Sequence, residues 1–222
     1  GSDPASSAGA IVDCPATTPS PAMQIPIFPL NTVLFPGGLL PLRVFEARYM
    51  DMTRECMRKG TPFGVCLIQE GHEVGSAAVP HTMGCLASIT DWDMQQLGVL
   101  QLRTLGGQRF RILSQRVASN GLITATVELL DHEQPGAPQS QHVVCVEVLR
   151  RIVEEHGAEV FIEPWQFDNA SWVGNRLSEV LAIPLPAKQK LMELQDSQAR
   201  LDVLTHFLLQ QQSTEPGENN SN

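Results

Sequence analysis

The sequence predicts an α+β fold in which a small mixed β-barrel with one inserted helix precedes a helical subdomain. Three observations predict this fold class. Short apolar or alternating runs, separated by Gly, Pro and Asn turns, fill residues 25–130. A polar stretch with two prolines follows at 131–141 and is the one plausible internal linker. Beyond it, apolar residues recur at the 3.6-residue spacing of helices.

Two strands are predicted at the start of the barrel, over residues 25–30 and 39–44, because both are apolar runs next to turn residues. The Pro-Gly-Gly sequence at 36–38 predicts a turn between them. Pro26 and Pro29 lie inside the first run. Because proline cannot donate a main-chain hydrogen bond, both suit an edge of the sheet rather than its middle.

One helix is predicted at 46–59, where the apolar residues change to helical spacing, and Gly60 is expected to end it. Phe45 and Tyr49 share this spacing and are expected to belong to the core. Gly106 and Gly107 together form a strong two-residue hairpin signal between two further strands. The two strands of this hairpin cover residues 97–105 and 108–117, and further strands are predicted at 63–69, 83–90 and 122–130.

The helical subdomain begins with apolar residues at helical spacing over 144–153, and Gly157 is expected to cap this first helix. Its many valines weaken the prediction, because β-branched residues lower helix propensity. Asp168 is expected to N-cap the second helix. Pro184 and Pro186 then separate the second helix from two further amphipathic helices.

The predicted organisation has four segments. They are a disordered leader at 1–23 that carries an expression scar at Gly1-Ser2, a barrel subdomain at 24–131, a helical subdomain at 139–210 and a disordered tail at 211–222. The five cysteines are odd in number and scattered along the chain. This usage is typical of buried thiols in a reducing compartment, and it predicts a cytoplasmic protein.

The charge balance argues against a broad nucleic-acid-binding face. The formal net charge is −9 and the chain has only three lysines, whereas phosphate binding requires clustered cations. We therefore expect no DNA partner and disfavour RNA. Arg109 and Arg111 share one face of a predicted strand and could hold a carboxylate or phosphate, but a solvated face is the preferred interpretation. No apolar run reaches the roughly 20 residues that span a bilayer, so no membrane partner is expected.

Motifs that carry catalysis are missing from the sequence. It has no G-x-x-x-x-G-K-[ST] phosphate loop. Ser178 and Lys188 could be combined into a dyad, but nothing marks the serine as an activated nucleophile. His81 and Cys85 lack the further ligands of a zinc site. The sequence therefore predicts a chain that is not an enzyme, with no catalytic residue, no cofactor and no metal.

Longer motifs add a family resemblance. The run FPLNTVLFPGGLLPLRVFEARY at 28–49, with WVGNRLSEVL at 172–181 and IPLP at 183–186, resembles the Lon protease N-terminal domain family over residues 24–210. The resemblance implies a PUA-like β pseudo-barrel followed by a helical subdomain, in a stand-alone member without the ATPase and Ser–Lys peptidase domains. It also implies a role in recognising polypeptides or docking to a partner protein.

Three large apolar residues, Trp92, Trp165 and Phe167, are the candidates for polypeptide contact. They lie in segments predicted as loops, where large apolar side chains are less easily buried. Trp165 and Phe167 either line a groove between barrel and helices or join the two parts. The preferred interpretation is a non-catalytic module that binds unfolded or partly unfolded polypeptide, or a partner protein. The alternatives are an RNA-binding PUA-like protein and a hydrolase with an unrecognised site.

Overall fold

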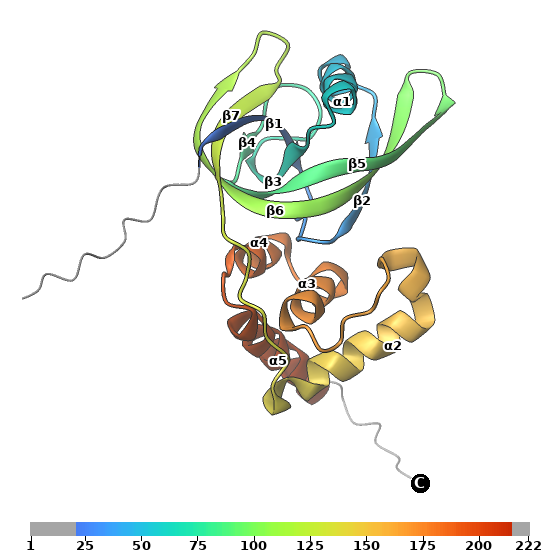
Figure 1. Ribbon diagram of the computed structural model, residues 1–222, viewed down its shortest axis with the longest axis vertical. Coiled ribbons are helices and arrows are strands. Elements are labelled where there is room, and N and C mark those ends of the chain that lie inside the picture. Colours follow the sequence, from blue (N-terminus) through green and yellow to red (C-terminus); the bar gives the residue numbers. More distant parts are fainter. Residues whose placement is uncertain (1–20, 215–222) are drawn as a thin grey trace, which may run out of the picture.

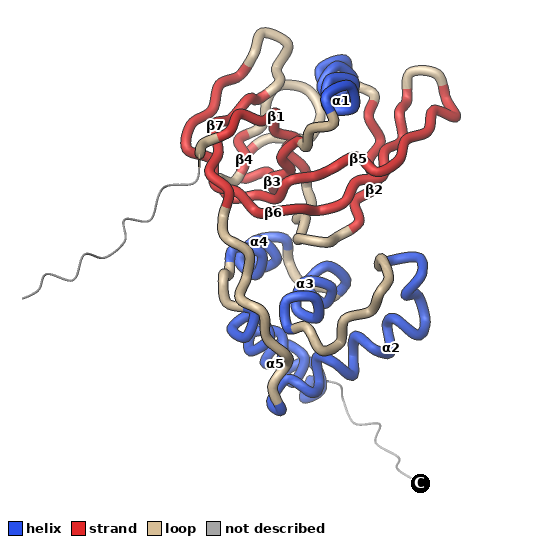
Figure 2. Tube along the Cα trace, viewed as in Figure 1, coloured by secondary structure: helices blue, strands red, loops and turns tan. Residues whose placement is uncertain are grey.

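The computed structural model describes residues 21–214. Most of the predicted leader at 1–23, and residues 215–222 of the predicted tail, lie outside these described residues. Strands fill the first part of the chain and helices fill the second, with one helix inserted among the strands (Figures 1 and 2). The predicted α+β fold class is therefore confirmed. We refer to residues 23–129 as the strand part and to residues 140–214 as the helical part.

The strand part contains seven strands and one helix within the described residues. The strands are β1 (Met23–Leu30), β2 (Leu39–Val44), β3 (Phe63–Glu70), β4 (Val79–Pro80), β5 (Met83–Gln96), β6 (Val99–Val117) and β7 (Ile123–Leu129). The inserted helix is α1 (Ala47–Lys59). It ends as predicted at Gly60, whose positive φ of 65° allows its N–H to bond to the carbonyl of Cys56.

The strands close into a ring because β1 has two partners. The order in the sheet is β1-β7-β6-β5-β3-β4, and β3 also pairs with β1. Strand β7 pairs with residues 23–27 of β1, whereas β3 pairs with residues 27–30 on its other side. Pro26 and Pro29 therefore each have a strand neighbour on one side only, which suits residues without an N–H donor. Strand β2 lies outside the ring and pairs only with β6.

Strand β6 runs without a break through Gly106 and Gly107, so the predicted hairpin at these residues is wrong. The turn lies instead between β5 and β6, where Gly98 has a φ of 83°. Strand β5 continues to residue 96, and Trp92 is consequently in a strand rather than a loop. Gly106 serves a close approach, because a Cβ atom there would lie 2.1 Å from the main-chain oxygen of Phe35.

The helical part is an assembly of one short 3₁₀ segment and four α-helices within the described residues. They are η1 (Ser140–His142), α2 (Val143–Val160), α3 (Ala170–Val180), α4 (Leu185–Glu193) and α5 (Ser197–Thr214). Helix α5 runs four residues beyond the predicted subdomain end at residue 210. The first four residues of the predicted disordered tail are thus helical.

Two caps differ from those predicted. Gly157 lies inside α2 and not at its end. It leaves room for the indole of Trp165, since a Cβ atom would lie 3.2 Å from that ring. Asn169, not Asp168, caps α3, and its Oδ1 accepts a hydrogen bond from the N–H of Trp172 at 3.3 Å. Neighbouring Asp and Asn residues have similar capping propensities, so composition alone cannot choose between them.

The two parts share a hydrophobic core. Leu149, Leu177 and Leu201 are fully buried at the centre of the helical cluster. Phe35 and Leu67, from the strand part, belong to the same cluster. Helices α2 to α5 gather on one side of the strands, opposite α1, and residues 130–139 connect the parts without regular structure (Figure 1). The core positions the strand part against the helices along an interface that we call the seam.

Candidate polypeptide-binding surface

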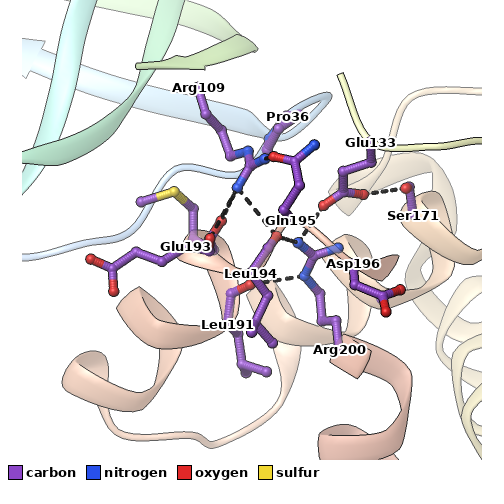
Figure 3. A network of polar contacts seen from close by, with 12 residues as sticks. Pro36, Arg109, Glu133, Ser171, Leu191, Glu193, Leu194, Gln195, Asp196 and Arg200 are labelled. Atoms are coloured by element: carbon purple, nitrogen blue, oxygen red, sulfur yellow. Dashed lines mark hydrogen bonds and ion pairs between the residues drawn. The ribbon is translucent and has the colours of Figure 1, made fainter. Parts of the chain in front are cut away.

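Buried arginines fill the seam. Arg109, from β6, is 3% exposed, and its Nη1 donates hydrogen bonds to three main-chain oxygens at the end of α4 (Figure 3). The acceptors belong to Met192 at 2.9 Å, Glu193 at 3.3 Å and Leu194 at 3.2 Å. The last carbonyls of a helix have no partner within it, and a cation there also complements the helix dipole. The interpretation of Arg109 as a solvated charge is therefore wrong.

Arg200 fixes the connecting segment onto the helices. This α5 residue is fully buried, and its Nε donates to the main-chain oxygen of Leu191 at 2.9 Å. Its Nη2 donates to the main-chain oxygen of Leu194 at 2.6 Å and to the carboxylate of Glu133 (Figure 3). The same carboxylate accepts a hydrogen bond from the hydroxyl of Ser171 in α3. Glu133 therefore joins the connecting segment to two helices through one buried carboxylate.

A second buried ion pair fixes the 36–38 turn to α3. Arg176 donates to the main-chain oxygen of Pro36 at 2.6 Å and to both carboxylate oxygens of Glu179, at 2.6 and 3.0 Å. A Cβ atom at Gly37 would lie 2.8 Å from the guanidinium, and one at Gly38 would lie 2.4 Å from the carboxylate. A side chain at either position would therefore displace one member of this ion pair. The Pro-Gly-Gly motif serves folding, as part of the seam.

The protonation of Glu179 makes stability depend on pH. Burial raises the pKa of this carboxyl group from 4.5 to about 7, against the opposing effect of Arg176. A carboxyl group with a higher pKa in the folded state binds its proton more tightly when folded. The free energy of unfolding should therefore fall as the pH rises from about 4.5 to about 7, by at most about 3 kcal/mol.

Urea unfolding at several pH values within this window measures the effect. Glu179→Gln does not titrate, so its decline in stability with pH should be smaller than that of the unmodified protein. Glu154→Gln removes an exposed carboxylate from α2 and serves as the matched control. It should keep the original pH profile. Equal slopes for the unmodified protein and Glu179→Gln would contradict the prediction.

Trp165 and Phe167 pack within the helical part. Their ring centroids lie 6.4 and 5.5 Å from that of Trp172. The guanidinium carbon of Arg150 lies 4.2 Å from the ring centroid of Phe167. These partners come from α2 and α3, so the contacts describe a helical cluster rather than a groove at the seam. Trp92 lies elsewhere, on β5. Polypeptide contact by these three residues stays a prediction.

The polar residues considered for catalysis have other partners. Ser178 is fully buried, and its hydroxyl donates to the main-chain oxygen of Gly174 at 2.7 Å. The Lys188 ammonium donates to the main-chain oxygen of Glu179 at 2.7 Å. Ser178 and Lys188 therefore do not form a dyad. Over residues 21–214, no three His, Cys, Asp or Glu side chains are grouped as a metal site. None of the helices described is long and apolar enough to cross a membrane.

Two adjoining grooves flank β2. The first, of about 400 Å³, lies between β2, the end of β1 and the loop before β4. The second, of about 570 Å³, lies along β2, β5 and β6. Both are lined by Pro41, Leu42 and Arg43. We call the residues that line either groove the β2 surface. The others are Phe28, Leu30, Thr32, Leu40, Val44, Phe45, Glu46, Tyr49, Glu73, Val74, Asp91, Trp92, Asp93, Gln101, Leu102 and Arg103.

Stacked aromatic rings contribute to the wall of the first groove. The ring of Tyr49, from α1, lies parallel to that of Phe28 with centroids 4.0 Å apart. The guanidinium of Arg48 lies 4.7 Å from the Tyr49 centroid and forms an ion pair with Glu46 at 3.2 Å. Burial raises the pKa of the Tyr49 hydroxyl, which is therefore neutral at physiological pH. The Tyr49 ring is therefore held in place by the Phe28 ring and the Arg48 guanidinium.

Large apolar side chains are exposed on the β2 surface. Phe45 and Trp92 are each 54% exposed, and Val74 is 57% exposed. Exposed Met94 and Leu97 continue this apolar character along the β5–β6 hairpin. Clustered exposed apolar groups mark interaction sites in soluble proteins. Sequence reasoning selected Trp92 but assigned Phe45 to the core. The spacing of Phe45 from α1 residues suggested a buried helical face, yet Phe45 precedes the helix, so helical periodicity does not apply to it.

A strand ring that is joined to helices by hydrogen bonds from buried arginines, and that exposes apolar side chains over two grooves, defines a two-part α+β binding module. A family model described as the ATP-dependent protease La (LON) substrate-binding domain matches residues 24–210. The chain belongs to this family, which confirms the resemblance found in the sequence. The family description supports substrate recognition as the general role of the chain.

Two solved structures of Lon N-terminal domains resemble the fold of this chain. A Lon N-terminal domain protein from Xanthomonas campestris is 36% identical with a TM-score of 0.71, over 83% of this chain and 98% of that one. The N-terminal domain of the Mycobacterium avium complex Lon protease shares the fold, with 14% identity and a TM-score of 0.61 over 83% of this chain and 97% of that one.

Two curated relatives are similar over part of their length. Lon protease 2 of Myxococcus xanthus is 24% identical over 192 residues, which are 83% of this chain and 23% of the relative. Protein cereblon of Gallus gallus is 29% identical over 110 residues, which are 48% of this chain and 24% of the relative. The chain thus spans about a quarter of the length of these two relatives.

Proposed function

We propose that the β2 surface binds exposed apolar segments of unfolded or partly unfolded polypeptides without altering them chemically. The observation that carries this proposal is the pair Phe45 and Trp92, two half-exposed aromatic side chains that line adjoining grooves. An unfolded segment exposes the apolar side chains that a folded partner would bury. The family description as a substrate-binding domain supports the same role.

The energetics suit weak and reversible capture. Removing apolar surface from water contributes about 25 cal/mol per Å², and association costs offset much of that gain. Aromatic anchors commonly dominate such interfaces. Binding in the micromolar range is therefore expected from an apolar surface of this modest size. A module of this kind can hold a segment briefly and release it unchanged.

Removing both aromatic anchors should weaken binding of a permanently unfolded model protein by at least about 10-fold, because each anchor contributes on the order of 1 kcal/mol or more. The test is a fluorescence anisotropy titration of the Phe45→Ala/Trp92→Ala protein. Leu113→Ala/Val117→Ala is the matched control, since these β6 side chains are 54% and 55% exposed and lie outside the β2 surface. Equal weakening by both pairs would show that any exposed apolar group suffices, and would count against the proposal.

Trp165→Ala/Phe167→Ala tests the other two residues selected from the sequence. Their contacts with Trp172 and Arg150 hold both rings against the helical part. We expect this pair to lower the melting temperature more than it lowers affinity at a temperature where the variant stays folded. Loss of binding by this folded variant, with Phe45→Ala/Trp92→Ala unaffected, would move the site to the helical part.

RNA binding, the alternative from the sequence, has little support from the arginines that suggested it. Arg109 is buried and donates to carbonyl oxygens of α4. Arg111 forms an ion pair with Glu128 at 3.0 Å. The net charge of −9 opposes a phosphate backbone. A titration with single-stranded RNA at low salt, where phosphate contacts are strongest, should therefore show no binding.

A further inference from the structure

Strand β2 has one edge without a strand partner. It pairs with β6 over Leu39–Val44, and its other edge lines the first groove. The N–H of Gly106 donates to the carbonyl of Gly38 at 2.8 Å, which fixes the hydrogen-bonding register. Because bonded and non-bonded pairs alternate in antiparallel strands, the main-chain groups of Leu39, Pro41 and Arg43 point away from β6. Pro41 has no N–H, which agrees with this register.

The facing side of the first groove is also a strand edge. Phe28 and Leu30 line the groove from the end of β1. Strand β7 covers β1 only as far as Ile27, and β3 occupies the opposite side of residues 27–30. The first groove is therefore an opening in the sheet between the end of β1 and β2. Figure 1 shows β2 at the margin of the sheet, beside α1.

We infer that an extended polypeptide segment occupies this opening as an added strand on the free edge of β2. The inference rests on the proposed function and specifies how the segment is held. Main-chain N–H and C=O groups at strand spacing are matched by another main chain, which gives affinity independent of client sequence. Side chains on one face of the segment would contact the apolar walls, including Phe45 and Val74.

The charged side chains that line the first groove indicate which residues the bound segment carries. Glu46 is paired with Arg48, and Glu73 accepts a hydrogen bond from the N–H of Asn31 at 2.7 Å. Arg43 is exposed and has no ion-pair partner within residues 21–214. Its guanidinium is the one cation that lines the first groove, and no carboxylate within residues 21–214 pairs with it. The bound segment therefore alternates apolar and polar residues and places an acidic side chain beside Arg43.

N-methylated peptides test the added strand. The probe is a fluorescent ten-residue peptide with alternating Val and polar residues and one central Glu. Two derivatives carry N-methyl groups on alternate amides, one on the odd set and one on the even set. The added strand makes its main-chain hydrogen bonds to β2 alone and meets the end of β1 only through side chains, so one derivative should bind at least about 10-fold more weakly and the other within about 3-fold of the parent. Equal effects of the two sets would overturn the added strand.

Amide exchange on the protein gives an independent readout. Hydrogen exchange followed by NMR should slow at the Arg43 N–H when the parent peptide is bound. The Leu42 N–H points toward β6 and should already be protected in the free protein. Unchanged exchange at Arg43 under saturating peptide would overturn the inference. A dimer of the free protein that the peptide dissociates in sedimentation would instead assign the edge to a second copy of this chain.

A charge exchange tests the acidic position. Changing the central Glu of the peptide to Lys should weaken binding about 3-fold, and Arg43→Glu should restore binding of the Lys peptide. Tighter binding of the Lys peptide to the unmodified protein would contradict the charge match.

If the parent peptide does not bind at all, the proposed function fails. If it binds through Phe45 and Trp92 with equal effects of both methylation sets, the proposed function stands and the added strand is wrong.

Discussion

Replacing Arg200 with alanine is expected to lower the free energy of unfolding by about 3–5 kcal/mol. The guanidinium is fully buried, and its removal leaves the Glu133 carboxylate without its countercharge. The carbonyl oxygens of Leu191 and Leu194 also lose a donor. A buried acceptor or charge without a partner is more costly than the original pair was favourable. Urea denaturation monitored by circular dichroism measures the difference.

Arg151→Ala is the matched control for Arg200→Ala. Arg151 is exposed on α2, so its replacement should change stability by no more than about 0.5 kcal/mol. Adding Glu133→Gln to Arg200→Ala should recover part of the loss, because the uncompensated charge is then absent. A loss of less than about 1 kcal/mol for Arg200→Ala alone would show that the pair does not hold the connecting segment to the helices.

Gly106→Ala should destabilise the protein by about 3 kcal/mol or more, because the added methyl group has no space. The new Cβ atom would lie 2.1 Å from the main-chain oxygen of Phe35. That oxygen already accepts a hydrogen bond from the Gly38 N–H at 3.0 Å, and Gly37 donates to the Gly106 oxygen at 2.8 Å. The turn therefore cannot move away without losing main-chain hydrogen bonds, and thermal denaturation should show the loss directly.

Gly107→Ala is an unusually close control, since it changes the next residue of the same strand. A Cβ atom at Gly107 would have Leu86 atoms at 3.6 Å as its nearest neighbours, which is ordinary contact. Its effect should stay within about 1 kcal/mol, and the loss of glycine flexibility could even stabilise the strand. Comparable losses for both substitutions would mean that glycine flexibility, rather than the contact with Phe35, governs this position.

Local rules predicted much of the fold because the relevant partners are close in sequence. Gly60 ends α1 through a hydrogen bond to a residue four positions earlier. Pro184 and Pro186 separate α3 from α4, as their fixed φ and missing donors require. The same local rules failed at Gly106 and Gly107, since a glycine pair signals a turn and a close approach equally well.

The site was only partly predictable for a related reason. Trp92 was selected because it is a large apolar residue in a segment predicted as a loop, although it lies in β5. Phe45 has the same exposure, but its helical spacing from residues of α1 suggested burial. The free edge of β2 has no sequence signal of its own. It exists because β7 leaves β1 at Ile27 and β2 pairs with β6 alone.

The sequence by itself determined that a strand part precedes a helical part, the family and the absence of a phosphate-loop motif, because these depend on composition, spacing and contiguous motifs. Only the tertiary structure decided which charges are buried. Arg109 meets acceptors 83 to 86 residues away, and Arg200 meets Glu133 across 67 residues. An arginine on a solvated face and one that caps a distant helix have the same local sequence. Their difference comes from desolvation and hydrogen-bond partners that exist only after the chain has packed.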